Sequence, residues 1–244
     1  MRRSPLRLVA VLIGALLAAL PATAGGWEKA GVEDGVVIYN RDKEGSDVKE
    51  VKAIGTINAP NWVVKNVVDD VANYKDFMPY TKVSTLKKGK GDSVITYQYL
   101  EMPLVSNRDY TLRITDKSFV NKAGQVVYKN VWTPANHLGP KPKDGAVRLN
   151  INDGYWVLEP IDGGKKTKAT YYVYTNPGGS IPSWIANRAN FQAIPALFDA
   201  VKSQSKKAKY KKTKPTLTAS VQKALDAQKA PAPAPQTAPA STTP

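Results

Sequence analysis

His137 is the only histidine in the chain, and it is the first candidate for catalysis because imidazole is the usual general base near neutral pH. A Ser–His–Asp hydrolase would have to use this residue, yet no G-x-S-x-G motif accompanies it. His137 lies in a loop rich in proline and glycine, where fastening the loop is the simpler role. The absence of cysteine excludes thiol catalysis and cysteine-ligated metals. We therefore expect no catalytic residue, no metal site and no cofactor.

Two other polar positions are better suited to binding than to catalysis. Arg108 and Asp109 could present a charge to a ligand at the wall of a cavity, or form an internal ion pair or a hydrogen-bonded clasp that pins a loop. Gln98 alternates with Thr96 and Leu100 in a predicted strand. A buried amide there needs a partner, which a ligand hydroxyl, the backbone or water could supply. The sequence leaves these alternatives open.

The elements that must position these residues are strands followed by a helix. Residues 27–30 could start a short helix, and residues 59–77 keep helical spacing of valines. Turn signals separate segments with strand composition, which indicates an antiparallel meander with helices grouped apart, an α+β fold. The predicted strands are residues 36–39, 48–57, 82–87, 94–100, 108–116, 126–132, 146–151, 155–159 and 168–175.

The stretch from Tyr171 to Val201 organises the rest of the chain. A tyrosine-rich strand reaches a Gly178-Gly179 turn, and a helix follows in which Trp184, Phe191, Ile194, Phe198 and Val201 mark one apolar face. We expect this helix to lie across a curved sheet and close a cavity. Pro195, inside the helix, predicts a kink that is either a hinge or a static bend.

The two ends of the chain differ from the body. Residues 1–24 have early arginines, an apolar run and an Ala-Thr-Ala site, which predicts a cleaved signal peptide of a bacterial protein that is periplasmic or secreted. The single domain spans residues 25–205, and residues 206–244 predict a disordered tail, basic and then rich in proline and alanine. Much of the net charge of +15 lies at these ends, so the body is not expected to bind nucleic acid.

Several segments of the body, spread over residues 27–201, resemble the START family of steroidogenic-acute-regulatory-related lipid-transfer domains. They include the PLVSNRDY stretch, the HLGPKPKDGAVRLNINDGYWVLEP stretch, and NPGGSIPSW, which is similar to the family's Asp-Pro-Gly-Gly turn with asparagine in place of aspartate. They begin at residues 103, 137 and 176 respectively. The resemblance implies a helix-grip fold, in which a curved antiparallel sheet wraps around the C-terminal helix and encloses a tunnel for one lipid.

The resemblance also implies non-catalytic binding and transfer of a sterol, a phospholipid or a similar molecule by a monomer that contacts membranes transiently. It makes the loop of Met102, Leu104 and Val105 a gate to the tunnel, although ordinary loop packing is the alternative. The lysines after Val201 could bring the tunnel mouth to an anionic membrane, or simply be solvated. The predicted ligand-binding residues are Gln98, Met102, Leu104, Val105, Arg108, Tyr110, Leu112, Tyr128, Leu149, Ile151, Phe191, Ile194 and Phe198.

Two other functions remain consistent with the sequence. One is an enzyme of cyclase or hydrolase type built on a related cavity, which would need acid and base groups converging there. The other is a module that binds cell-envelope polymers through its basic tail.

Overall fold

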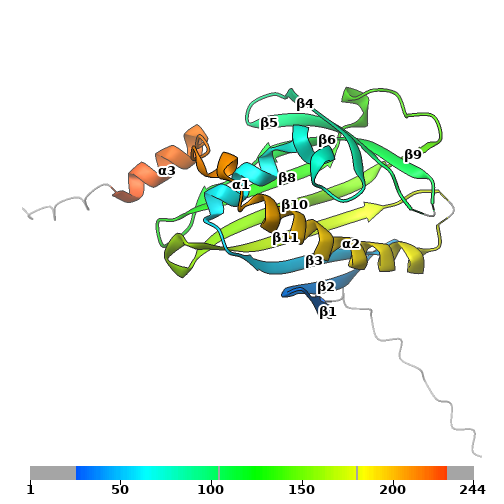
Figure 1. Cartoon of the computed structure of the whole chain (residues 1–244), viewed down its shortest axis with the longest axis horizontal. Coiled ribbons are helices and arrows are strands. Elements are labelled where there is room, and N and C mark those ends of the chain that lie inside the picture. The colour runs from blue at the N-terminus through cyan, green and yellow to red at the C-terminus, as the bar shows by residue number, and fades with distance from the viewer. Residues whose placement is uncertain (1–25, 104, 180, 230–244) are drawn as a thin grey trace, which may run out of the picture.

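A computed structural model describes residues 26–103, 105–179 and 181–229 (Figure 1). Its centre is a sheet with strand order β1-β2-β3-β11-β10-β8-β6-β5-β4, in which all neighbours on this path are antiparallel. The strands are β1 Glu28–Glu33, β2 Val36–Lys43, β3 Ser46–Ile57, β4 Thr81–Lys88, β5 Ser93–Leu100, β6 Asn107–Asp116, β7 Phe119–Val120, β8 Val126–Pro134, β9 Ala146–Arg148, β10 Ile151–Ile161 and β11 Lys166–Asn176.

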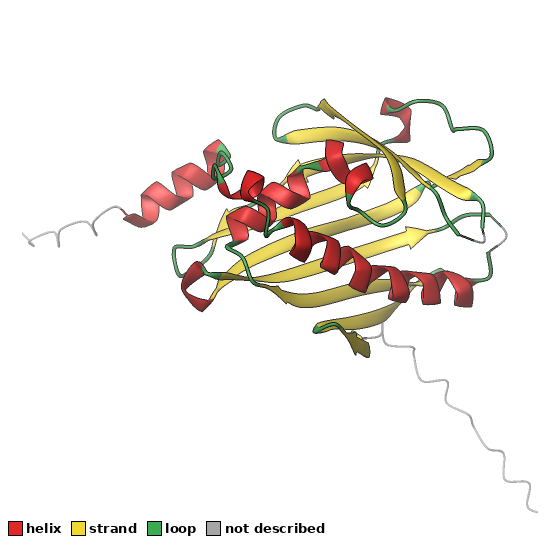
Figure 2. Cartoon of the chain, in the orientation of Figure 1, coloured by secondary structure: helices red, strands yellow, loops and turns green. Residues whose placement is uncertain are grey.

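The helices at residues 61–69 and 183–204 lie against one face of this sheet, and the helix at residues 219–229 lies at one end of the molecule (Figure 1 and Figure 2). They are α1 Asn61–Asp69, α2 Ser183–Gln204 and α3 Ala219–Lys229, with shorter 3-10 helices η1 Val71–Asp76, η2 Asn136–Leu138, η3 Asp162–Gly164 and η4 Ala208–Lys211. Helices and an antiparallel sheet in separate layers confirm the predicted α+β helix-grip class. Within the described ranges, no helix combines the length and apolar character needed to cross a membrane.

Some predicted elements were wrong in detail. The short helix expected at residues 27–30 is instead the start of β1, because this segment pairs with β2 at the edge of the sheet. The early helix ends at Asp69, and η1 continues the segment to Asp76 as a tighter turn. The strand expected over residues 146–151 divides, since β9 runs parallel to β6 and β10 begins at Ile151. Tertiary pairing, rather than local propensity, decides these boundaries.

Helix α2 packs on the concave face of the sheet through the second half of its apolar stripe. Phe198 is fully buried, and a β-carbon at Gly55 on β3 would lie 2.9 Å from its ring, so only glycine lets the ring sit this close. Phe191 lies equally close over Gly31 of β1. Trp184, predicted to share the buried stripe, is 67% exposed, because the first turn of α2 lies at the margin of the sheet (Figure 1).

The chain after α2 is not the disordered tail that was predicted, at least as far as residue 229. Tyr210 is buried, and the Asn66 amide on α1 donates to the carbonyls of Tyr210 and Thr213 at 2.9 and 2.8 Å. Val221 of α3 is also buried. We call residues 206–229 the lysine strap. The average composition of this segment predicts disorder, because an average does not detect two single apolar side chains, Tyr210 and Val221, that become buried. The predicted signal peptide and residues 230–244 lie outside the described residues.

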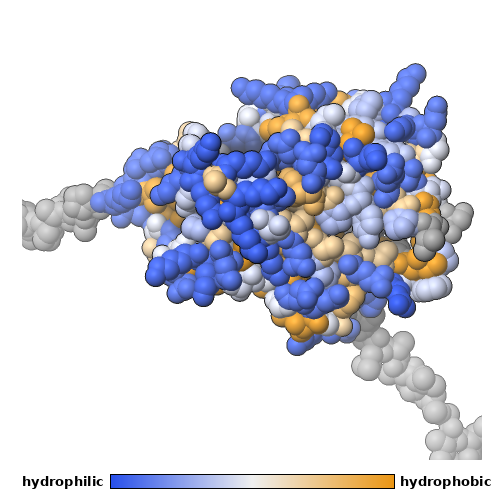
Figure 3. All heavy atoms as spheres, viewed as in Figure 1, coloured by the Kyte–Doolittle hydropathy of each residue, from blue (hydrophilic) through white to orange (hydrophobic). Residues whose placement is uncertain are grey.

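The strap carries a dense positive charge on a fixed backbone. Its lysines at positions 206, 207, 211, 212 and 214 are exposed, whereas Lys209 pairs with Asp70 at 3.0 Å. Figure 3 shows hydrophilic residues gathered over the end of the molecule where α3 lies. The strap follows the C-terminal end of α2, so the length of that helix, about 33 Å, separates it from the Gly178-Gly179 turn.

Removing the Tyr210 side chain should release the strap. Tyr210 donates to the Asp70 carboxylate at 2.7 Å while its ring is buried. Loss of a buried aromatic group costs several kcal/mol, so Tyr210→Ala should speed tryptic cleavage at residues 206–214 by at least about tenfold. Limited digestion followed by mass spectrometry measures this. Lys223→Ala, which changes an exposed strap residue, should leave the rate near the wild-type value, and equal rates for both variants would contradict the anchoring role.

Candidate functional site

Strand register assigns the predicted binding residues to the two faces of the sheet. Trp156 of β10 contacts Phe198 of α2, with ring centroids 5.3 Å apart, and therefore marks the concave face. Residues that pair directly across neighbouring strands lie on the same face of a sheet, and every second residue along a strand shares that face. The pairing of β10 with β8, of β8 with β6 and of β6 with β5 therefore places five predicted residues on the face of Trp156: Tyr128, Leu112, Tyr110, Gln98 and Arg108. These five residues thus share the face on which α2 lies, as the predicted cavity requires.

The other predicted residues have different outcomes. Phe191, Ile194 and Phe198 all lie on the sheet-facing side of α2, with Ile194 and Phe198 buried and Phe191 half-buried. Leu149 is buried in the connection between β9 and β10, where its N–H donates to the Asp109 carbonyl at 2.9 Å. Ile151 was wrongly assigned to the interior.

Ile151 lies on the convex face because β10 alternates without a bulge along its pairing with β11. It shares the parity of Tyr155, whose ring stacks on Tyr172 at 4.9 Å on the outer side of the sheet. The sequence pattern could not exclude a bulge between Ile151 and Tyr155, and a bulge reverses the facing of every residue beyond it.

A set of neutral polar groups lies inside the apolar concave face. The Tyr110 hydroxyl donates to Gln98 Oε1 at 2.7 Å, and the Trp132 indole N–H donates to Asn152 Oδ1 at 3.3 Å, with all four residues buried. We call these four residues the interior polar cluster. Burial raises the pKa of Tyr110, so its phenol stays protonated at neutral pH. The cluster can therefore donate and accept hydrogen bonds through neutral groups.

The sequence predicted half of this cluster. Trp132 and Asn152 were missed, although the signal was present in simple alternation: Trp132 follows Tyr128 by four residues, and Asn152 precedes Trp156 by four. Even spacing along an unbulged strand places such residues on one face. What the sequence could not show is that β8 and β10 are neighbours.

One aromatic ring beside the cluster keeps part of its surface exposed. Tyr171 pairs with Trp156 across β10 and β11, and its ring lies 4.8 Å from the Trp156 ring on the concave face. It nevertheless remains only half-buried, while burial raises the pKa of its phenol. Thr96, on the same face of β5, has a fully buried hydroxyl without a hydrogen-bond partner among the described residues. A buried polar atom without a partner indicates a place where a ligand atom could bind.

Replacing Tyr110 with phenylalanine tests the cluster directly. The variant leaves the Gln98 carbonyl without its donor in an apolar interior, so the free energy of unfolding should fall by about 1–3 kcal/mol. Urea denaturation followed by tryptophan fluorescence measures the change. Tyr39→Phe, on the convex face of β2, serves as the matched control and should shift the midpoint little. Equal shifts in the two variants would show that the buried hydrogen bond adds nothing.

One end of the interior is bounded by the loop after β5 and the turn before α2, and Arg108 joins them. Its Nε donates to the Pro177 carbonyl at 3.2 Å, and its Nη1 donates to the Ser106 carbonyl. We call this arrangement the Arg108 clasp and this end of the interior the mouth. Of the alternatives that the sequence left open, the clasp is the one observed.

The loop expected to act as a gate is therefore held at the mouth. Met102 is half-buried, and its N–H donates to Asn107 Oδ1 at 3.1 Å. Val105 is 36% exposed, and Leu104 lies outside the described residues. Whether this loop opens stays a prediction.

Asp109 does not pair with Arg108, because adjacent strand residues point to opposite faces. Its carboxylate instead accepts two hydrogen bonds from Arg148 at 2.7 and 3.0 Å and one from the Lys143 N–H at 2.9 Å. Burial opposes ionisation of this fully buried group, but these hydrogen bonds outweigh it and keep the pKa of Asp109 below its usual value. Asp109 therefore ties the β9 segment to β6 on the convex side.

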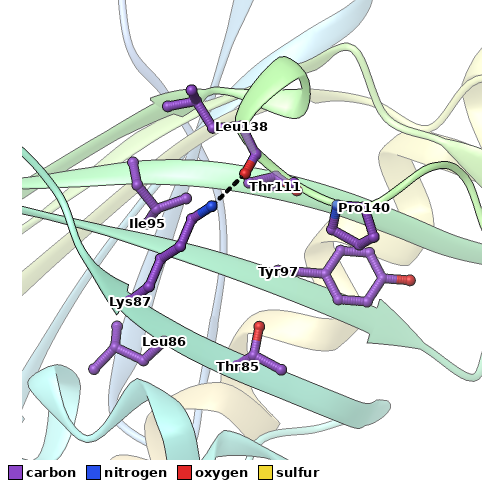
Figure 4. Close-up of a pocket in the computed structure, with 9 residues that line it drawn as sticks. Thr85, Leu86, Lys87, Ile95, Tyr97, Thr111, Leu138 and Pro140 are labelled. Carbon is purple, nitrogen blue, oxygen red and sulfur yellow. Dashed lines mark hydrogen bonds between the residues drawn. The ribbon is translucent and has the colours of Figure 1, made fainter.

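Two open depressions on the surface do not belong to this interior. One, of about 390 Å³, is lined by Thr85, Lys87, Tyr97 and the loop at residues 138–140 (Figure 4). Tyr97 has the opposite parity to Gln98, so this depression lies on the convex face. The other, of about 330 Å³, lies between the β2–β3 turn and the segment of Asn176–Gly179 and Ile181.

Comparisons with known proteins agree with this geometry. The family model described as "START domain" matches residues 13–202. An uncharacterized protein of Pseudomonas aeruginosa is 32% identical over 167 residues, covering 68% of this chain and 80% of that protein. The phosphatidylcholine transfer protein of Bos taurus is 27% identical over 197 residues, covering 79% of this chain and 90% of that protein.

Among solved structures, the STAR-related lipid transfer protein fragment from Xanthomonas axonopodis aligns with a TM-score of 0.66 at 28% identity. The alignment covers 75% of this chain and all of that one. Human STARD10, at 17% identity and a TM-score of 0.64, has the same fold. The match to the family model over most of the chain, together with the sheet that grips α2, establishes that this chain belongs to the START domain family.

Proposed function

We propose that this protein binds a single lipid between α2 and the concave face of the sheet and transfers it, without catalysing a reaction. The observation that carries the proposal is the interior polar cluster, buried on an apolar face beside the half-buried ring of Tyr171. Apolar walls with a few placed polar groups are typical of sites that bind hydrophobic ligands. The relatives named as lipid and phosphatidylcholine transfer proteins support the same general function.

The chemistry of the cluster favours binding over catalysis. Its donors and acceptors are an amide, a phenol, an indole and a second amide, of which only the phenol titrates. An enzyme would need a group that gains or loses a proton near neutral pH, and burial moves the pKa of Tyr110 in the wrong direction for a base.

The protein would exchange its lipid at the mouth while touching a membrane. Val105 is exposed on the loop that bounds the mouth, and Trp184 is exposed in the first turn of α2, directly after the turn that bounds it. Tryptophan favours the interface between water and lipid, so these residues suit a shallow and transient contact. The lysine strap follows the opposite end of α2, so a membrane bound there would not be the one that faces the mouth.

We also propose that the protein works as a monomer in the periplasm or outside the cell, delivered by the signal peptide predicted in residues 1–24. Support comes from the sequence alone: early arginines, an apolar run too short for a typical membrane span, and a small-residue cleavage site. N-terminal sequencing of the protein from its host would test the cleavage.

A transfer assay between vesicles tests the lipid-carrier function. Donor vesicles contain a fluorescent phosphatidylcholine and a quencher lipid that does not exchange, and the protein should raise the rate of fluorescence recovery when acceptor vesicles are added. Organic extraction of the purified protein should yield about one lipid per chain. The proposal fails if neither transfer nor bound lipid is found, or if extracted lipids are chemically altered by the protein.

Matched variants on one strand make the test specific to the cavity. Val173→Trp enlarges a buried residue on the concave face of β11, close to Tyr171, and should reduce transfer at least severalfold. Thr170→Trp adds the same group to the convex face and should leave transfer unchanged. If deleting residues 206–244 abolishes activity while Val173→Trp does not, the function lies in the strap and not in the cavity. Circular dichroism confirms that each variant folds.

A further inference from the structure

Arg108 is a buried cation that has no anion beside it. Only 4% of its surface is exposed, and among the described residues no carboxylate oxygen lies within 4.0 Å of its guanidinium. All 20 Asp and Glu residues of the chain fall within the described ranges, so no acidic side chain remains to pair with it. Burial accordingly lowers the pKa of Arg108. A buried charge without a counterion is costly, which makes its retention at the mouth notable.

Among the described residues, hydrogen bonds to neutral carbonyls use only part of this side chain's donors. Arginine has five N–H donors, of which one on Nε and one on Nη1 bind the carbonyls of Pro177 and Ser106. On the Nη2 side, a β-carbon at Gly179 would lie 4.0 Å from that nitrogen, and this glycine has a φ of +68° that a side chain would rarely adopt. Because residue 179 is a glycine, it places no side chain beside the N–H donors of Nη2.

The location of Arg108 connects this charge to the proposed lipid site. Arg108 is on the concave face of β6, two residues before Tyr110 of the interior polar cluster. Its partners belong to the two segments at the mouth, the loop ending at Ser106 and the turn beginning at Pro177. The nearest oppositely charged groups in sequence do not compete, since Asp109 is on the convex face and bound to Arg148.

We propose that Arg108 binds an anionic oxygen group, a phosphate or a carboxylate, at the polar end of the lipid. This inference rests on the lipid-binding function and narrows it to lipids that carry such a group. Two parallel hydrogen bonds from a guanidinium to an anion are stronger than bonds to neutral carbonyls. The arriving head group therefore replaces the carbonyls of Ser106 and Pro177, so the clasp opens when a suitable lipid enters.

Binding of matched fluorescent lipids tests the inference on the full chain. The probes share one labelled acyl chain and differ only at the polar end: phosphatidic acid, phosphatidylcholine and diacylglycerol. Wild-type protein should bind both phosphate-bearing lipids more tightly than diacylglycerol by about tenfold to a hundredfold, as expected for hydrogen bonds to a charged group. Arg108→Gln should remove this preference, and Arg108→Lys, which keeps the charge without the fork, should retain part of it.

Controls separate this inference from the proposed function and from misfolding. Arg113→Gln removes the same charge from an exposed position on the same strand and should leave the preference intact. Inorganic phosphate at millimolar concentration should not displace the lipids if the anion must arrive on an apolar chain, and displacement would mean that the site is for free phosphate.

Failure of the wild type to bind any of the three probes would defeat the lipid-carrier function itself. Binding of all three with equal affinity, or an Arg108→Gln variant that still binds diacylglycerol and keeps the phosphate preference, would overturn only the role of Arg108. Because binding of diacylglycerol by Arg108→Gln reports a folded cavity, loss of the preference in that variant cannot be mistaken for unfolding.

Discussion

Asp109→Asn should lower the free energy of unfolding by about 3–5 kcal/mol, the cost of removing one partner from a buried ion pair. Asp109 is fully buried, and the Arg148 side chain is 14% exposed, so the arginine would be left without an anion in a poorly solvated place. The substitution also weakens two further hydrogen bonds that the Asp109 carboxylate accepts, from the Lys143 N–H at 2.9 Å and from the Tyr97 hydroxyl at 3.2 Å. Urea denaturation measures the loss.

An exposed ion pair provides the control for Asp109. Glu159 and Lys168 on neighbouring strands lie 2.9 Å apart, with side chains 39% and 46% exposed. Glu159→Gln should cost no more than about 1 kcal/mol, because water screens exposed pairs. A similar loss in both variants would show that burial does not strengthen the Asp109 pair.

The pH dependence of the free energy of unfolding, compared between the wild type and Asp109→Asn, gives a second test of the ion pair. The pKa of Asp109 is lower in the folded state than in the unfolded chain, despite burial, because of its hydrogen bonds from Arg148 and Lys143. Its stabilisation is therefore complete above the ordinary carboxyl pKa and is lost as the pH falls through the folded value. The wild type should lose stability over this acid range, and Asp109→Asn should lose correspondingly less.

Phe198→Ala should destabilise the fold by about 3–5 kcal/mol, as expected for removing a fully buried aromatic ring. Phe198 fills the space between Gly55 of β3 and Trp156 of β10, and so holds α2 on the sheet. Thermal or urea unfolding measures the effect. Because the ring also forms one wall of the proposed lipid site, transfer should fall even at temperatures where the variant is folded.

Phe119→Ala is the matched control, since Phe119 of β7 is 46% exposed. It removes the same ring from the surface and should change the stability by less than about 1 kcal/mol. If the two variants unfolded at the same urea concentration, α2 would not depend on Phe198 for its place on the sheet. The hydrophobic grip described above would then be incorrect.

The arrangement of charge suggests that the two ends of the molecule do different work. Exposed apolar side chains and the buried cation Arg108 lie in and beside the mouth, whereas the lysine strap carries exposed cations at the far end of α2. The strap lies beyond residue 202, where the match to the family model ends. Comparing transfer by the full chain and by a chain ending at residue 205 would show whether the strap affects the rate.

The sequence by itself determined the class of the fold and the place of its key helix. Turn residues between alternating strands identified the meander, and the spacing of Phe191, Ile194 and Phe198 identified the face of α2 that packs on the sheet. These features depend on neighbours a few residues apart, so they can be read locally. The motifs around Arg108 and Gly178 likewise identified the family before the geometry was known.

Tertiary structure alone decided which residues face inward together. Ile151 and Tyr155 are an apolar and an aromatic strand residue, of the kind that often faces a core. They nevertheless lie on the convex face, because the pairing of β10 with β8 and β11 fixes its register. Asn152 and Trp132 meet only because those strands are neighbours.

The segment after α2 and the Arg108 clasp follow the same rule. Tyr210 and Val221 order a segment whose average composition predicts disorder, because each finds a place on the core. Arg108 lies at the meeting point of two segments about 70 residues apart in sequence, each supplying one carbonyl. Contacts between distant segments depend on the path of the whole chain, and no local pattern of residues records that path.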